Sequence, residues 1–158
     1  MKWYSCTPYE ATLIRLQSCK LSLVEGTLVA REEVPINQLL INCGHPLSEV
    51  AAAELEARIG AYDTVVVRLQ LDVDASLAEQ VTAAIDDAGL SSEDWQTRGI
   101  VLNLPGMSGA TALVLAEVNG RSGAFPRVLH LVRGEDGVFH LGEILDLARV
   151  RNTARQTR

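Results

Sequence analysis

The chain is poor in lysine, aromatic residues and cysteine, and it contains no long apolar run. Its 14 Lys and Arg residues stand against 20 Asp and Glu residues, a net charge of −6. Such an acidic chain is a poor candidate for binding duplex nucleic acid, because counterion release from the duplex rewards a basic surface. The three cysteines are an odd number and show no CxxC spacing, so they indicate neither a disulfide framework nor a metal site.

No stretch is apolar over the roughly 20 residues that a membrane-spanning helix needs; the run from Ala110 to Ala116 is one of the longest. No charged segment leads into an apolar one at the N-terminus, as it does in signal peptides. With 47% hydrophobic and 22% charged residues, the composition is that of a globular protein. The sequence therefore predicts a soluble, cytoplasmic protein with no membrane partner and no cofactor.

Residues 1–37 differ in composition from the remainder. They hold both lysines and two of the three cysteines, and their charges sum to zero, so residues 38–158 carry the whole net charge. We expect residues 1–37 to be an N-terminal appendage, either disordered or translated from a misplaced start, and residues 38–158 to form one domain. The alternative is a true N-terminal hairpin built from the short apolar segments 21–24 and 27–30.

Apolar patterning in residues 38–158 predicts alternating strands and helices. The expected strands are 38–43, 64–73, 100–104, 127–132 and 138–145, and the expected helices are 49–59, 77–88, 110–118 and 147–156, with a polar loop over 91–99. Strands joined through helices become parallel neighbours, and the last two strands form a hairpin around residues 134–137. The fold class is therefore α/β, a three-layer Rossmann-like domain whose mostly parallel sheet ends in a C-terminal antiparallel hairpin.

Two loops lie at the expected carboxyl edge of this sheet, where open α/β sheets bind ligands. The first, residues 42–48, follows the first strand; the second, residues 103–110, follows the third. Each joins a small or glycine-containing turn to a helix N-terminus, so free backbone N–H groups and the helix dipole favour an anion such as phosphate. The alternative for either loop is an ordinary capped turn. The candidate ligand-binding residues are Asn42, Gly44, His45, Ser48, Asn103, Pro105, Gly106, Ser108 and Gly109.

Four further residues have simpler interpretations. His130 and His140 lie on the hairpin strands, where they can face each other as surface residues. Arg121 follows the end of the third helix and is expected to complement its dipole. Trp95 is expected to anchor the polar loop 91–99 to the core.

Residues 39–155 resemble a family of small stand-alone CRISPR-associated proteins of type III loci, the Csx group, with a fold like the CRISPR-associated Rossmann (CARF) domain. The resemblance is carried by the segments LINCGHPL at 40–47, GLS at 89–91, DWQT at 94–97, NLPG at 103–106, LAE at 115–117, NGR at 119–121, FP at 125–126 and EILDL at 143–147. The chain departs from the family at Val118-Asn119, where many members have leucine and histidine.

The resemblance implies a homodimer that binds a cyclic oligoadenylate second messenger between its subunits, with cyclic tetra-adenylate as the expected ring. Sequestration of the messenger is favoured over its cleavage, because neither loop contains Lys or Arg and His45 is the one side chain there with a suitable pKa for acid–base chemistry. Two alternatives stay open. One is a metal-independent ring nuclease with His45 as its catalytic candidate, and the other is a non-catalytic interaction subunit.

Overall fold

The structure is a computed structural model that describes residues 21–24, 27–30 and 37–157. The chain divides into two compact units, Met1–Pro35 and Ile36–Arg158. In the first, strands β1 (Leu21–Val24) and β2 (Thr27–Ala30) pair antiparallel, as the hairpin alternative expects. The other expectations for residues 1–37, disorder or a misplaced start, fall mainly on residues outside the described ones.

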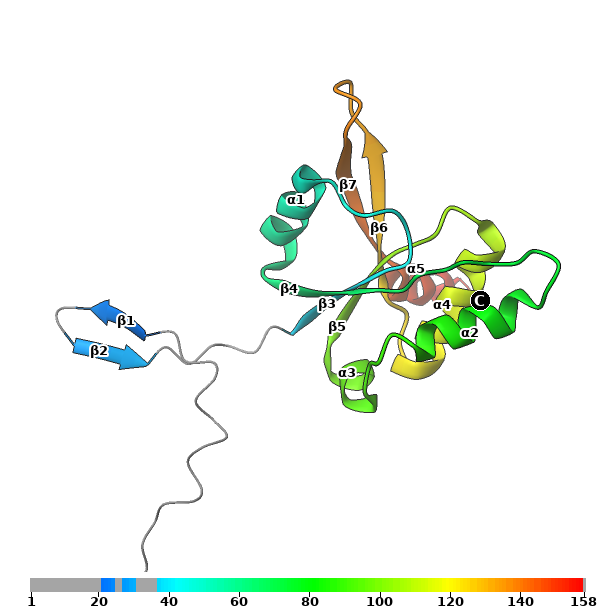
Figure 1. Cartoon of the computed structure of the whole chain (residues 1–158), viewed down its shortest axis with the longest axis horizontal. Coiled ribbons are helices and arrows are strands. Elements are labelled where there is room, and N and C mark those ends of the chain that lie inside the picture. The colour runs from blue at the N-terminus through cyan, green and yellow to red at the C-terminus, as the bar shows by residue number, and fades with distance from the viewer. Residues whose placement is uncertain (1–20, 25–26, 31–36, 158) are drawn as a thin grey trace, which may run out of the picture. The chain divides into compact units, whose positions relative to one another are not determined.

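The second unit is an α/β domain with a five-stranded, mostly parallel sheet, as the sequence predicted (Figure 1). Its strands are β3 (Gln38–Asn42), β4 (Tyr62–Val66), β5 (Gly99–Asn103), β6 (Arg127–Arg133) and β7 (Phe139–Asp146). Its helices are α1 (Glu49–Ile59), α2 (Leu77–Asp86), α3 (Ser92–Thr97), α4 (Ser108–Ser122) and α5 (Leu147–Gln156). The strand order is β4-β3-β5-β6-β7, in which only the β6–β7 pair is antiparallel.

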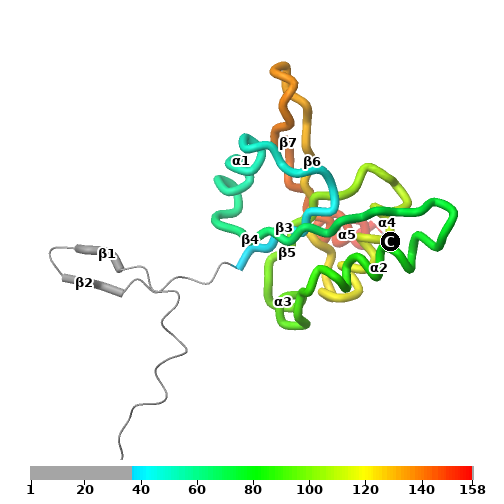
Figure 2. The backbone as a smooth tube through the Cα atoms, in the orientation of Figure 1, coloured from blue at the N-terminus to red at the C-terminus, as the bar shows by residue number. Residues whose placement is uncertain are grey.

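Helices cover both faces of the sheet, which makes three layers (Figure 2). Alternate residues of β3 serve the two faces: Leu39 and Ile41 pack with α2 and α4, whereas Leu40 packs with Leu55 of α1. Because the neighbouring strands alternate in the same way, each face carries its own buried apolar layer. The buried runs of β3 and β5 are therefore typical of strands covered on both sides.

The second strand is shorter than predicted. β4 ends at Val66, although the sequence predicted a strand to residue 73. The neighbouring strand β3 stops at Asn42, whose carbonyl accepts a last bond from the Val67 N–H at 2.9 Å, so the chain beyond has no strand to pair with. The apolar alternation nevertheless continues in residues 67–71, here called the strap: Val67 is buried and Arg68 is exposed.

Two helix predictions were wrong. Residues 92–97, expected in a loop, form the helix α3, which starts with a capping box in which Ser91 and Asp94 bond each other's backbone. Trp95 of this helix is buried, which confirms the expected anchor. α4 does not stop at residues 119–120 but continues to Ser122, and Gly123 ends it with a φ of 71°.

The position of Arg121 changes accordingly. It lies inside the last turn of α4, where it pairs with Glu117 of the same helix and with Asp86 of α2, and its guanidinium stacks over the Trp95 ring with 5.7 Å to the centroid. Arg121 thus joins three helices, a larger role than complementing the dipole of α4.

Candidate functional site

The loops after β3 and β5 lie side by side at the carboxyl edge of the sheet. β3 and β5 are adjacent parallel strands, and the chain leaves them for opposite faces, toward α1 from β3 and toward α4 from β5. Loops that part in this way open a crevice at the point where the strand order reverses, which is the usual ligand site of open α/β sheets. The predicted pair of loops is therefore brought together at the place expected for a ligand.

Two buried asparagines join these loops. Asn42 and Asn103 are 5% and 6% exposed. Nδ2 of Asn103 donates to Oδ1 of Asn42 and to the carbonyl of His45, both at 2.9 Å, and the same Asn42 oxygen accepts the Gly44 N–H at 3.1 Å. These hydrogen bonds hold the first loop against the second, so the two buried asparagines fix the positions of the loops relative to each other.

Gly44 is required by the closeness of the loops. A Cβ at this position would lie 2.7 Å from the backbone oxygen of Leu104 and 3.1 Å from Nδ2 of Asn103. Any side chain would therefore push the loops apart or break the asparagine pair.

The two helix N-termini at this edge are not equivalent. At α1, the Ser48 hydroxyl accepts the Ala51 N–H at 3.1 Å and donates to the Phe139 carbonyl at 2.5 Å. Ser48 thus caps its own helix and ties it to β7, which removes one donor from the first predicted phosphate site. At α4 the N-cap residue is Met107, which supplies no side-chain bond, and the first turn contains no acidic residue.

The start of α4 is open to an anion. The backbone N–H groups of Ser108, Gly109 and Ala110 precede the first intrahelical bond, which runs from Thr111 N to Met107 O at 2.9 Å. Residues 106–109 are exposed. Gly106 and Gly109 do not have positive φ, and a Cβ on Gly109 would meet only Leu77 at 3.7 Å, so neither glycine is dictated by backbone conformation.

A hollow of about 450 Å³ lies between the loops and the strap. Among the predicted residues, Gly44, His45, Pro105 and Gly106 line it. Ser48, Ser108 and Gly109 are not among its lining residues, and the two asparagines are buried. The hollow is further lined by Cys43, Met107 and residues 66–71.

The residue that sequence reasoning missed is Arg68. It is exposed, lines the hollow and forms no ion pair with any of the residues that the structure describes. The sequence placed it inside a long strand, whereas the strap carries it past the end of β3 to the edge where the loops lie. A positive charge is therefore available to the loops, although neither loop contains one.

Cys43 is the described thiol at this site. Burial raises its pKa to about 11, so the thiol is neutral near pH 7. Because the thiolate is the reactive form of cysteine, Cys43 is not equipped as a nucleophile.

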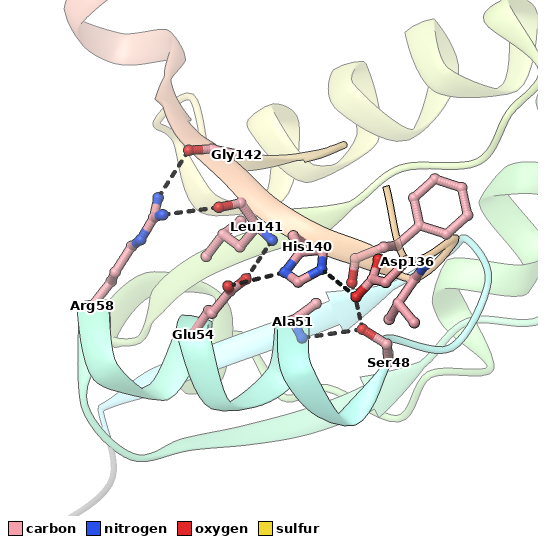
Figure 3. Close-up of polar contacts among 10 residues, drawn as sticks. Ser48, Ala51, Glu54, Arg58, Asp136, His140, Leu141 and Gly142 are labelled. Atoms are coloured by element: carbon pink, nitrogen blue, oxygen red, sulfur yellow. Dashed lines mark hydrogen bonds and ion pairs between the residues drawn. The ribbon is translucent and has the colours of Figure 1, made fainter. Parts of the chain in front are cut away.

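The β6–β7 hairpin is fastened to α1 by charged side chains (Figure 3). Glu54 accepts the Leu141 N–H at 2.7 Å and contacts Nδ1 of His140 at 3.3 Å, and Asp136 contacts Nε2 of the same ring at 3.2 Å. Arg58 donates to the carbonyls of residues 141 and 142. The predicted facing of the two hairpin histidines is wrong, because the register pairs His130 with Glu143 and His140 with Val132.

These contacts shift three pKa values. Asp136 and then Glu54 raise the pKa of His140 through hydrogen bonds to its ring. The Leu141 N–H, and secondly His140, lower the pKa of Glu54. The Val138 N–H, and secondly His140, lower the pKa of Asp136. The cluster thus favours a protonated imidazole between two carboxylates.

Comparison with known proteins identifies no family for this chain: no family model, no curated protein and no solved structure matches it. Among residues 37–157, no group of three or more His, Cys, Asp or Glu side chains is arranged to hold a metal ion. No helix within the described segments is long and apolar enough to cross a membrane.

Proposed function

We propose that the protein binds a cyclic oligoadenylate second messenger, with cyclic tetra-adenylate as the expected ring, and sequesters it to dampen signalling. The observation that carries the proposal is one exposed hollow lined both by Met107, the N-cap of α4 that supplies no side-chain bond, and by Arg68, which forms no ion pair with a described residue. Backbone N–H groups and a guanidinium are the two donors best suited to a phosphate diester. The resemblance of residues 39–155 to CARF-like proteins of type III CRISPR loci is the reason for proposing a cyclic oligoadenylate as the phosphate-containing ligand.

The proposed binding unit is a homodimer. A cyclic ring of phosphates has rotational symmetry, so a two-fold pair of subunits can offer each half of the ring the same groups. Each subunit would contribute the first-turn amides of α4 and one Arg68. Because a hydrogen bond to a charged group contributes roughly 1.5–3 kcal/mol, a few such contacts per subunit suffice for tight binding. Such a protein would act in the cytoplasm, where the messenger is made.

Sequestration fits the residues better than cleavage. Metal-free cleavage of a ribonucleotide linkage needs the 2′-hydroxyl aligned with phosphorus and gains from a general base. His45 lines the hollow and is exposed, and Cys43 beside it is held neutral. One exposed imidazole provides few groups for acid–base catalysis, so sequestration is preferred. The ring nuclease remains the competing function, and the experiment must distinguish it from sequestration.

The test measures binding of cyclic tetra-adenylate by calorimetry and product formation by chromatography on the same samples. Arg68→Gln removes one charge per subunit and keeps a polar side chain that can donate hydrogen bonds, and we expect at least a tenfold loss of affinity. Arg149→Gln, an exposed arginine of α5, is the matched control and should bind as the wild type does. Stoichiometric binding with intact ring supports sequestration, linear products from excess ring would establish the nuclease, and absence of binding by the wild type would leave an interaction subunit.

Gly109→Glu tests the start of α4 separately. The new carboxylate would occupy the anion site, so affinity should fall at least tenfold, a cost of about 1.4 kcal/mol. The fold should tolerate it, because an acidic residue near a helix N-terminus is mildly favourable and Gly109 has no positive φ. A large loss of melting temperature with unchanged affinity would show that Gly109 serves only the turn.

A further inference from the structure

Helix α5 packs little against the residues that the structure describes. Leu147, at its start, packs against the core, but the chain from Arg149 to Thr157 is exposed and the helix has no buried residue. A helix of ten residues is marginal in water and normally gains its stability from an apolar face packed on something else. α5 is therefore a surface helix without the apolar packing that usually stabilises a helix of this length.

The residues of α5 indicate what kind of surface would pack against it. Leu147, Val150 and Ala154 follow the spacing i, i+3, i+7 and share one side of the helix, and Val150 is 60% exposed. Arg151 and Arg155 lie next to this stripe one turn apart. α5 contains no acidic residue, and its arginines form no ion pair with any described residue.

The chain carries a complementary surface on α2. Residues 69–97 contain seven Asp and Glu residues and no Lys or Arg. Along α2 and its C-cap residue Asp87, the residues Glu79, Ala83 and Asp87 follow the spacing i, i+4, i+8 and are all exposed. Neither Glu79 nor Asp87 forms an ion pair with a described residue, whereas Asp86 is held by Arg121.

A hollow of about 490 Å³ lies beside this acidic face. It is lined by alanines 83, 84 and 88 of the α2 region, by Val66 and by Asp87 at the rim, with Arg68, Gln70 and Gln80 completing it. The small side chains of α2 allow another helix to approach closely, and Val66 is 58% exposed here. The surface therefore combines an apolar floor with the carboxylates of Glu79 and Asp87, which form no ion pair with a described residue, and Arg68 is the one positive charge among the described residues that line the hollow.

We propose that α5 of one copy docks on α2 of a second copy of this chain. Val150 and Ala154 then cover the alanine-lined hollow, and Arg151 and Arg155 face Glu79 and Asp87. Charge favours this occupant: two α5 helices together would oppose arginine to arginine, whereas α5 against α2 sets Arg151 and Arg155 against two acidic residues, and Arg68 is the one like charge among the described residues that line the hollow. The two loops of the ligand site do not line this hollow, although Val66, Arg68 and Gln70 line both hollows. The association itself needs no nucleotide.

The experiment exchanges the charges of the two surfaces. One full-length variant carries Arg151→Glu and Arg155→Glu, and the other carries Glu79→Lys and Asp87→Lys. Sedimentation velocity without nucleotide should show that the wild type self-associates at micromolar concentration and that each variant alone does so at least tenfold more weakly. An equimolar mixture of the two variants should regain association, because the glutamates of one then face the lysines of the other.

A matched control carries Arg133→Glu and Arg149→Glu, which changes the net charge as much as the α5 variant does but leaves the stripe intact. It should associate as the wild type does, and melting temperatures of all variants identify any that fails to fold. A wild type that stays monomeric without nucleotide, or a mixture that associates no better than its components, overturns the proposal. Because no nucleotide is present and no variant changes Arg68 or the two loops, neither result tests nucleotide binding.

Discussion

The asparagine pair beneath the loops gives the sharpest test of how the site is held. Asn103 acts as the donor, to the Asn42 side chain and to the His45 carbonyl, and Asn42 acts as the acceptor, from Asn103 and from the Gly44 N–H. Replacing each amide by a carboxylate of nearly the same shape therefore has opposite consequences. A carboxylate can accept but cannot donate while it is ionised.

Asn103→Asp should be costly. The ionised carboxylate would face two acceptor oxygens at the present 2.9 Å separations, so both hydrogen bonds are lost and a buried charge is left unpaired. Two hydrogen bonds at roughly 1 kcal/mol each plus the unsatisfied groups amount to about 3 kcal/mol or more. For a domain of this size that lowers the melting temperature by about 12 °C.

Asn42→Asp should cost less than half as much at pH 7, because both donors that point at Oδ1 remain and bond a carboxylate well. The pH dependence separates the two variants further. In the Asn103→Asp protein only the protonated acid can donate, so its folded pKa lies above the unfolded value and stability rises as the pH falls from 7 to 4, relative to the wild type. Urea unfolding at several pH values measures this. Equal losses for the two variants, or a loss at residue 103 that does not change with pH, would refute the assignment of donor and acceptor.

Two further predictions concern the loops and the hairpin. Gly44→Ala should lower the melting temperature, since its Cβ would meet the Leu104 carbonyl at 2.7 Å, whereas Gly106→Ala, with no atom within 4 Å, should have little effect; thermal unfolding of the two variants compares them. The pKa of His140 is raised, so the stability that its contact with Glu54 and Asp136 contributes is fully present below pH 6.5 and is lost as the pH rises through the folded pKa. The pKa values of the two carboxylates are lowered, so the stability that they contribute is lost in acid. Wild type and His140→Leu should therefore differ most in urea stability in the mildly acidic range, and a difference that does not vary between pH 5.5 and 8.5 would contradict this.

Local signals in the sequence sufficed for most of the fold. The run Gln38–Asn42 is bounded by a turn, and Ser48 and Gly60 lie at the two ends of α1, so strand and helix are marked by residues within the element or next to it. The capping box of Ser91 and Asp94 was also present in the sequence, and it would have identified α3.

Other features depend on partners that are distant in the sequence. The chain has further β-branched residues after β4 ends at Val66, but a strand persists only as far as its neighbour does, and β3 stops at Asn42. α4 runs through Asn119 and Gly120 because Val118 and Arg121 are held by contacts with the sheet and with α2. Local helix and strand propensities predict neither the early end of β4 nor the extension of α4.

The site was predicted in the same partial way. The two loops follow from the strand order, and both lie at the predicted edge, but Arg68 reaches them only because β4 ends early. The sequence likewise does not show that the N-termini of α1 and α4 differ in capping, because the Ser48 hydroxyl at the start of α1 donates to the carbonyl of Phe139, 91 residues away.

Because Arg68 is the one arginine or lysine among the described residues that line the hollow, the proposed site makes a quantitative prediction about salt. Two subunits would place two arginines on the phosphates of one ring. For single-stranded nucleic acid, the logarithm of the binding constant falls with the logarithm of salt concentration by about 0.7 per neutralised phosphate, which gives a slope of about −1.4 for two. Affinity for cyclic tetra-adenylate should then fall only about sevenfold between 50 and 200 mM salt, and Arg68→Gln should make it nearly independent of salt. A slope of −3 or steeper would require further cations at the ring, and an unchanged slope in Arg68→Gln would exclude Arg68 from the contact.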